Sequence, residues 1–184
     1  MNVRRVVTGH DADGKAVFVS DERVEPFVPM LSPNSSFHML WGFDTVPHLP
    51  DDGSPPARSG YFPPQGGFRF NLFTLPPDGD NELPAGIDIA AAVAEMQARL
   101  PGMVDVIERE NPGMHTTATI DVEVVLSGTP VLELDDGVTV TLGVGDTVVQ
   151  NGTRHRWSNP GAEPATLAVV LVGAPHANVA EHRA

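Results

Sequence analysis

The sequence contains no cysteine among its 184 residues. A disulfide, a thiolate metal site and a cysteine nucleophile are therefore all excluded. Basic residues are also scarce, since 11 Lys and Arg compare with 24 Asp and Glu and the formal net charge is −13. An acidic protein repels phosphate backbones and anionic lipids, so we expect neither a nucleic acid nor a membrane partner.

Long apolar runs are missing as well. No run approaches the roughly 20 residues of a membrane-spanning helix, and residues 1–10 are too short in apolar length for a signal peptide. A cytoplasmic location is the default expectation. With 41% hydrophobic residues, the chain can bury a substantial core, and we expect residues 1–184 to form one domain.

The first 85 residues combine short strands with loops rich in Pro and Gly. Residues 3–8 and 16–20 are rich in Val and Phe and flank a polar loop that ends in Gly14, which predicts a hairpin. Residues 25–67 are dense in Pro and Gly, and only 36–41 are typical of a strand. Such a long connection is either a functional segment, such as a lid or an oligomer arm, or a surface segment that aromatic side chains attach to the domain. Its aromatic anchors are Trp41, Phe43, Tyr61 and Phe62.

The middle of the chain contains a strand and then a helix. Residues 68–75 alternate, which predicts a strand with Arg69, Asn71 and Phe73 on one face. Within 86–101 the composition changes to Ala, Glu, Met and Gln, with apolar residues at helical spacing from 89 to 100 and Asp88 placed as the cap. For residues 103–109 a short strand and a continuation of the helix both remain open.

After Gly113 almost every segment has a strand pattern. The expected strands are 119–126, 130–134, 138–142, 147–150, 155–158 and 165–172. Asp136 and Gly137 separate two alternating runs and accept the positive φ angles of a tight hairpin turn. Short, regularly spaced antiparallel strands are typical of a jelly-roll barrel, so we expect an all-β fold with an N-terminal extension and one inserted helix.

Two motifs in residues 113–173 carry the most specific signal. The first runs from Gly113 through His115, Thr117 and Asp121 to Gly128, and the second runs from Gly145 through His155 to Asn159. These motifs resemble those of the cupin superfamily. In that family the first motif supplies two histidines and a glutamate and the second a histidine, which together hold a divalent metal inside a double-stranded β-helix barrel. The resemblance places His115 at the first histidine, Thr117 at the second, Asp121 at the glutamate and His155 at the last.

Asp121 and Glu123 point to the same face of their strand, since side chains alternate. A straight chain would separate His115 from Asp121 by roughly 20 Å, so any shared site needs a turn between them. The resemblance implies that turn, and it brings His115, Asp121 and His155 together as ligands for Fe, Mn, Zn or Ni. Glu123 lies one pleat deeper and is the candidate to replace the missing motif histidine. In the alternative interpretation, both histidines are hydrogen-bonded interior groups without a metal.

A buried carboxylate pair beside imidazoles is also a set for general acid/base catalysis, because close like charges separate the two pKa values. We therefore assign catalytic roles to Glu123, Asp121 and His155. The alternative is that Arg69 or Arg154 neutralises the carboxylates. Substrate binding is assigned to Arg69, which could clamp an anion, and to Trp157 and Trp41.

Together these features predict a small-molecule enzyme, a lyase, dehydratase or isomerase that acts by acid/base chemistry on a carbonyl compound, with or without a divalent metal. A metal-dependent dioxygenase and a non-catalytic ligand-binding cupin are the alternatives. A homodimer is expected, because the N-terminal hairpin would otherwise leave an unpaired strand edge.

Overall fold

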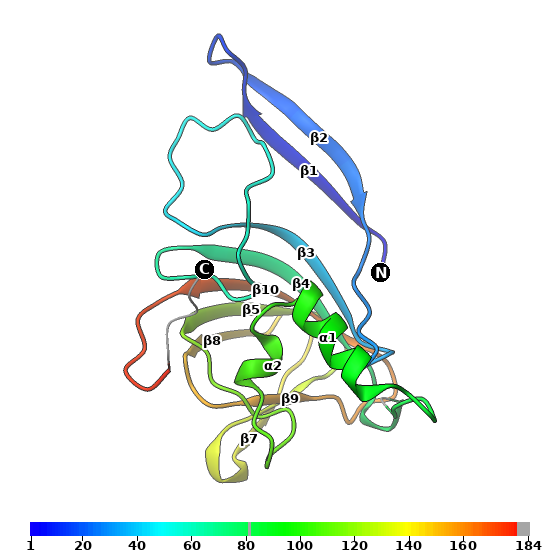
Figure 1. Ribbon diagram of the computed structural model, residues 1–184. Coiled ribbons are helices and arrows are strands. Elements are labelled where there is room, and N and C mark those ends of the chain that lie inside the picture. Colours follow the sequence, from blue (N-terminus) through cyan, green and yellow to red (C-terminus); the bar gives the residue numbers. More distant parts are fainter. Residues whose placement is uncertain (81, 180–184) are drawn as a thin grey trace.

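The computed structural model describes residues 1–80 and 82–179, and its main body is a barrel made of two antiparallel sheets. The larger sheet has the order β3 (Ser36–Phe43), β4 (Phe68–Leu75), β10 (Ala165–Gly173), β5 (Thr119–Ser127) and β8 (Thr147–Asn151). The smaller sheet has the order β7 (Thr139–Thr141), β6 (Val131–Glu133) and β9 (Arg156–Ser158). The expected all-β, double-stranded β-helix barrel is confirmed (Figure 1).

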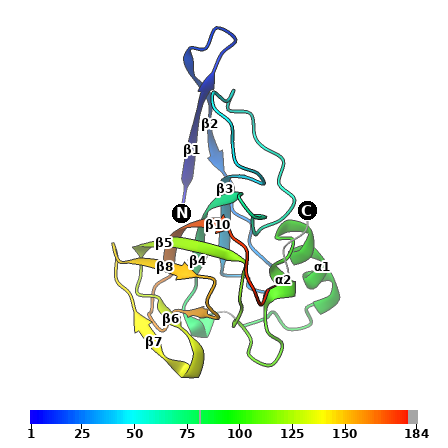
Figure 2. The same cartoon turned by 90° about the vertical axis from the view of Figure 1, so that its left-hand side faces the viewer.

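The N-terminal extension is a separate two-stranded hairpin. β1 (Val3–His10) and β2 (Ala16–Val24) pair antiparallel, from Val3 opposite Val24 to His10 opposite Ala16. In both views the hairpin stands away from the barrel (Figures 1 and 2). The predicted strands are confirmed and are longer than the sequence indicates.

The inserted helix is also confirmed, and it is followed by a second, much shorter one. α1 (Ile89–Arg99) begins at Asp88, whose side chain accepts a hydrogen bond of 3.1 Å from the backbone N–H of Ala91. Gly102 then takes a φ of 91°, which the chain needs to leave α1, and α2 (Met103–Val106) follows. Residues 103–109 therefore begin as a helical turn, and Ile107 after it forms a single antiparallel bridge with His115. Among the residues that the structure describes, no helix is long and apolar enough to cross a membrane.

Strand alternation decides which side chains enter the barrel. On β4, Arg69 and Asn71 are both 1% exposed, whereas Phe70 is 38% exposed on the outer face. On β5 the polar residues Asp121 and Glu123 point inward and the apolar Val122 points outward. The predicted faces of both strands are confirmed. This inverted pattern on β5 brings two carboxyl groups into the interior.

Two turns support this arrangement. The β6–β7 hairpin turns through a 3₁₀ segment, η2 (Asp135–Gly137), in which Asp136 and Gly137 have φ angles of 58° and 72°, as the Asp-Gly signal predicts. A second 3₁₀ turn, η1 (Asp78–Asp80), follows β4.

Residues 25–67 contribute to the core and are more than a surface coat. Tyr61 and Phe62 are buried and pack edge to face, with ring centroids 5.0 Å apart. Phe27 pairs with Phe37 of β3 through a backbone bridge. These contacts support the interpretation that aromatics attach the long segment to the barrel. They also place Tyr61 beside the polar interior of the barrel.

Candidate functional site

A cavity of about 850 Å³ lies against the inner face of the larger sheet. His115, Asp121, Glu123 and His155, the four residues that the sequence singled out, all line it. The rest of the lining is mainly apolar and aromatic, and includes Phe37, Tyr61, Phe62, Phe73, Met96 and Trp157. The interior is therefore a mostly apolar chamber with one group of titratable side chains, as small-molecule sites typically are.

The two carboxyl groups come from neighbouring inward positions of β5. Asp121 is 4% exposed and Glu123 is 5% exposed. Oδ1 of Asp121 and Oε2 of Glu123 have no hydrogen-bond partner within the described part of the chain. Buried carboxyl oxygens normally have such partners, so two of them together are unusual.

Neither arginine considered as a partner neutralises this pair. Arg69 donates to the Asp44 carboxylate, and Arg154 binds Glu108 through Nε and a terminal nitrogen at 2.5 and 2.7 Å. The interpretation that a salt bridge occupies the two β5 carboxyl groups is therefore not supported.

The environment separates the two carboxyl groups in acidity. Burial raises the pKa of Asp121 to about 6, partly offset by a hydrogen bond from the Thr119 hydroxyl. Burial also raises the pKa of Glu123, and the negative charge of Asp121 raises it further, to about 8. Near neutral pH, Glu123 is thus mainly protonated and can donate a proton, while Asp121 is mainly ionised and can accept one.

The two histidines form a pair across a backbone bridge. The N–H of His115 donates to the carbonyl of His155 at 2.9 Å, the reverse bond is 3.0 Å, and the ring centroids are 4.1 Å apart. Each Nδ1 lies 2.9 Å from a carbonyl oxygen, of Gly113 for His115 and of Thr153 for His155. Because a carbonyl only accepts, each Nδ1 carries the proton and each Nε2 keeps a lone pair.

Burial lowers the pKa of both histidines, and the neighbouring His115 lowers that of His155 further, to about 3. Both imidazoles are therefore neutral near pH 7. A neutral imidazole can accept a proton or a hydrogen bond at Nε2, but it is not a proton donor there.

The expected metal ligands do not gather around one point. Within residues 1–80 and 82–179, no three His, Cys, Asp or Glu side chains are placed to share a metal ion. The histidine pair and the carboxyl pair line the same cavity as two separate pairs. Thr117, at the position of the second motif histidine, hydrogen bonds at 2.8 Å to the Thr119 hydroxyl. This donor set does not fit a metal ion in the present arrangement.

Arg69 does not have a free donor for a substrate. Its five N–H groups are directed to the carbonyl oxygens of Gly60, Phe43 and Phe68 and to the Asp44 carboxylate. The structure therefore gives Arg69 the role of a tie between β4 and the segment that follows β3, and it does not support the proposed anion clamp.

The two tryptophans have different surroundings. Trp157 of β9 lines the cavity, where the sequence placed it. Trp41 does not line this cavity, and it has the Arg5 guanidinium 5.3 Å from its ring centroid and the Phe43 ring centroid 6.4 Å away. Trp41 therefore packs towards the N-terminal hairpin, and nothing in this arrangement supports a contact with substrate.

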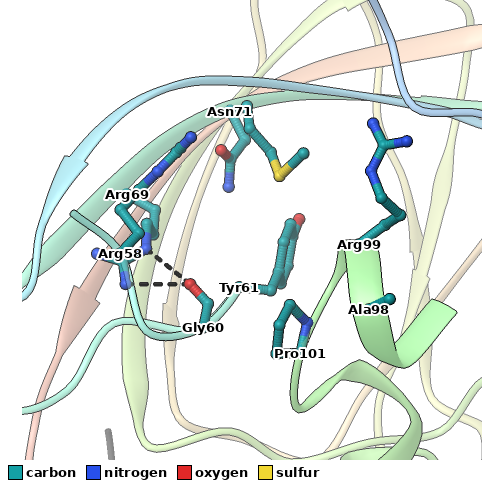
Figure 3. A pocket seen from close by; sticks show the side chains of 9 residues that line it. Arg58, Gly60, Tyr61, Arg69, Asn71, Ala98, Arg99 and Pro101 are labelled. Carbon is teal, nitrogen blue, oxygen red and sulfur yellow. Dashed lines mark hydrogen bonds between the residues drawn. The ribbon is translucent and has the colours of Figure 1, made fainter. Parts of the chain in front are cut away.

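Two interior residues were not predicted from the sequence as site residues. Tyr61 lines the cavity, and burial followed by the charges of Asp121 and Glu123 raises its pKa. Asn71 is 1% exposed, and neither atom of its amide has a hydrogen-bond partner among the described residues. The Tyr61 hydroxyl points towards this amide (Figure 3). Strand parity on β4 could have found Asn71, whereas no local pattern marks Tyr61.

The fold and the cavity together define a β-barrel that encloses a polar site for a small molecule. The family model described as a cupin domain, Cupin_2, matches residues 103–172, so this segment of the chain is similar to a cupin domain. The matched segment contains both histidines and both carboxyl residues of the cavity.

Two fungal proteins are similar in sequence. Phomopsin biosynthesis cluster protein C′ of Diaporthe leptostromiformis is 29% identical over 155 residues, which cover 84% of this chain and 69% of that protein. Oryzines biosynthesis cluster protein J of Aspergillus oryzae is 43% identical over 49 residues, 27% of each chain.

Solved structures show weaker similarity. A predicted oxalate decarboxylase of Thermotoga maritima aligns with a TM-score of 0.43 at 13% identity, covering 82% of this chain and 93% of that one. An RmlC-like cupin with a double-stranded β-helix fold from Methanocaldococcus jannaschii aligns with a TM-score of 0.38 at 14% identity, covering 59% and 72%.

Proposed function

We propose that the protein is a small-molecule enzyme that acts by general acid/base chemistry on a carbonyl compound, as a lyase, dehydratase or isomerase. The observation that carries this proposal is the buried pair Asp121 and Glu123, in which one oxygen of each carboxyl group has no hydrogen-bond partner among the described residues. The pKa values of the pair are raised to about 6 and about 8. Two carboxyl groups whose acidities are separated by their environment are the usual basis of an acid and a base in one site.

The chemistry follows from the protonation states. Ionised Asp121 removes a proton from the carbon next to a carbonyl group, and the electron pair of that C–H bond moves towards the carbonyl. Protonated Glu123 donates its proton to the carbonyl oxygen, or to a departing hydroxyl group, as the charge develops there. Neutral His155 offers a lone pair at Nε2 that can orient a hydroxyl group of the substrate.

The surroundings of the pair support a small organic substrate. The cavity of about 850 Å³ is lined mainly by apolar and aromatic side chains, Trp157 among them, and an apolar wall strengthens electrostatic contacts inside a site. The names of the two fungal relatives refer to biosynthesis clusters, which agrees with a role in small-molecule metabolism. The proposal also includes a cytoplasmic location and a homodimer, both carried over from the sequence.

The dioxygenase alternative requires a group of residues that holds a metal, and the histidine and carboxyl pairs do not form one in this arrangement. The remaining alternative is a cupin that binds a small ligand without converting it. A catalytic assay separates this alternative from the proposal.

The test is a screen of 2-oxo and 3-hydroxy carbonyl compounds in D₂O, in which NMR follows C–H exchange and product formation. We expect at least one compound to be converted, and Glu123→Gln to lower that rate by at least about 100-fold, since a positioned acid contributes about 10²–10⁴. The matched control is Glu163→Gln, because Glu163 is exposed and does not line the cavity. Compounds that bind to the parent without any exchange would favour the non-catalytic alternative.

A further inference from the structure

A second cavity, of about 200 Å³, lies beside the first, and Tyr61 lines both. Three arginines line it: Arg69 from β4, Arg99 from the end of α1 and Arg58 from the segment before Tyr61. In Figure 3, Arg58 and Arg69 lie on one side of Tyr61 and Arg99 on the other. Three guanidinium groups around one small cavity are notable in a chain with 11 basic residues and a net charge of −13.

Two of these three arginines form no ion pair with the described residues. Arg69 is neutralised by Asp44, but the ion pairs of the described residues include neither Arg58 nor Arg99. The guanidinium of Arg99 lies 4.7 Å from the centroid of the Phe27 ring, which fixes its position without neutralising it. The Arg58 side chain is exposed overall. Partial desolvation of its guanidinium, followed by the charges of Arg69 and Arg5, lowers its pKa.

The floor of the cavity contains a polar group without a partner. Asn71 is 1% exposed and lines the cavity, and within the described residues neither amide atom has a partner at full hydrogen-bond geometry. The Tyr61 hydroxyl lies near enough to this amide for the contact to lower the pKa of Tyr61, but too poorly aligned to satisfy it. A buried amide in this state is costly, so a native structure normally supplies a partner for it. A ligand that accepts a hydrogen bond from the amide NH₂ group would remove this cost.

We propose that this cavity binds the oxyanion group of a small molecule, a carboxylate or a phosphate, between Arg58 and Arg99 and above Asn71. Both arginines are exposed and form the entrance, while Asn71 and Tyr61 are buried at the base. Guanidinium groups bind both kinds of oxyanion in a bidentate manner. The volume is below the roughly 300–1,000 Å³ of typical ligand sites, so the cavity fits an anionic group with few further atoms.

The position of this site narrows the substrate class. Asn71 pairs with Val169, and Val169 pairs with Glu123, so Asn71 and Glu123 occupy one row on the inner face of the sheet. They are two strand spacings apart, about 10 Å. A molecule bound at both ends would carry its oxyanion about that far from its carbonyl group. This assignment to the substrate rests on the proposed function, whereas binding of the anion does not.

The experiment measures anion binding directly. The parent protein is titrated with sodium phosphate, with succinate and with sodium chloride at matched ionic strength, by calorimetry and by thermal unfolding. Saturable binding of phosphate identifies a phosphate site, and saturable binding of succinate identifies a carboxylate site. We expect the double variant Arg58→Gln, Arg99→Gln to bind at least about tenfold more weakly, because hydrogen bonds to charged groups are strong. Arg23→Gln, on the exposed face of β2, is the control and should bind like the parent.

Equal anion binding by the double variant and the parent would overturn the proposal. A thermal shift that sodium chloride reproduces would also overturn it, because general screening of charges would then explain the shift. Circular dichroism confirms that the variants are folded. Glu123→Gln separates this proposal from the proposed function, since it should keep anion binding while turnover is lost. Anion binding in a protein that converts no carbonyl compound would contradict the function and leave the site in place.

Discussion

His115 and His155 each donate a backbone N–H to the other's carbonyl oxygen, which holds their rings 4.1 Å apart at the wall of the cavity. The two residues come from different motifs, and the bridge brings them together. Because burial lowers the pKa of both histidines and raises that of Glu123 to about 8, the usual roles are exchanged. Near pH 7 the imidazoles are neutral and Glu123 is mainly protonated, which is why we propose Glu123 as the acid.

This exchange predicts a bell-shaped pH dependence of the rate. Activity should rise as Asp121 ionises, with an apparent pKa of about 6, and fall as Glu123 loses its proton, with an apparent pKa of about 8. Asp121→Asn should abolish the acid limb together with most of the activity. A profile that is flat between these values, measured with any compound that the screen identifies, would show that the two carboxyl groups are not the acid and the base.

The raised pKa of Glu123 should also make the free energy of unfolding depend on pH. Its pKa is raised from 4.5 to about 8 in the folded state, so in this interval the folded protein holds a proton that the unfolded chain has released. Its contribution to the free energy of unfolding is therefore fully present below pH 4.5 and is lost as the pH rises towards 8, by on the order of a few kcal/mol.

Glu123→Gln keeps the shape and cannot ionise, so it should remove this loss. We expect the variant to be within about 1–2 kcal/mol of the parent at low pH and to become relatively more stable as the pH rises. Urea unfolding of both proteins at pH 5, 7 and 8.5 measures the difference. The buried histidines act in the opposite direction below pH 6.5, but they are present in both proteins. A stability difference that does not change with pH would contradict the raised pKa.

The fold was predictable because its signals are local. The alternation of residues 68–75, the capping position of Asp88 and the turn at Asp136 and Gly137 each depend on a few neighbouring side chains. The interior position of Glu123 followed from strand parity once the barrel was assumed. Residues 103–109 could not be assigned, since α2 has four residues, which is too short for a periodic signal.

The partners in the site were less predictable, since they depend on tertiary contacts. Parity correctly placed Arg69 on the same face as Asn71, yet its partner Asp44 and the carbonyl of Gly60 come from an irregular segment without a period. For the same reason Tyr61 was identified only as an apolar anchor. The separation of the expected ligands into a histidine pair and a carboxyl pair depends on distances that no spacing rule contains.

The tie between Arg69 and Asp44 should contribute strongly to stability. The Arg69 side chain is 2% exposed and that of Asp44 is 24% exposed, so removal of the carboxylate leaves a buried cation with carbonyl partners alone. We expect Asp44→Ala to destabilise the protein by about 3 kcal/mol, which corresponds to a fall in Tm of roughly 6–12 °C for a chain of this size.

Asp21→Ala is the control for this substitution, because its ion pair with Arg4 is exposed and the solvent screens such pairs, so they contribute little to stability. Scanning calorimetry of both variants makes the comparison. Equal losses of Tm would mean that Asp44 is not a buried structural partner of Arg69.

Removal of metal tests the geometry of the two pairs. Since no three potential ligands of the described residues share a point, we expect protein purified without a tag to keep its Tm and its anion binding after dialysis against EDTA. Metal analysis provides the second measurement. The parent protein could instead contain a stoichiometric metal that His155→Ala loses while its circular dichroism spectrum is unchanged. That result would support the metal site expected from the sequence, with His155 as a ligand.

Exposed apolar residues on the outer face of the larger sheet indicate where two copies of the chain would contact each other in a homodimer. Val122 and Val149 are paired across β5 and β8 and are 45% and 61% exposed, and Ile120 and Val172 are 38% and 39% exposed nearby. Phe18 on the N-terminal hairpin is 80% exposed. Contiguous exposed apolar surface of this kind marks an interaction site, and a second copy of the same face is self-complementary in a two-fold dimer.

We therefore expect light scattering at micromolar concentration to give twice the monomer mass. Val122→Glu combined with Val149→Glu should produce a monomer, because like charges would then meet across the interface. Val140→Glu is the matched control, since Val140 is 49% exposed on β7 of the other sheet, and this variant should remain dimeric. A monomeric mass for the parent protein would show that the predicted homodimer does not form. If the parent and the double variant are both dimeric, the interface does not include Val122 and Val149. The edge of the N-terminal hairpin would then be the next surface to mutate.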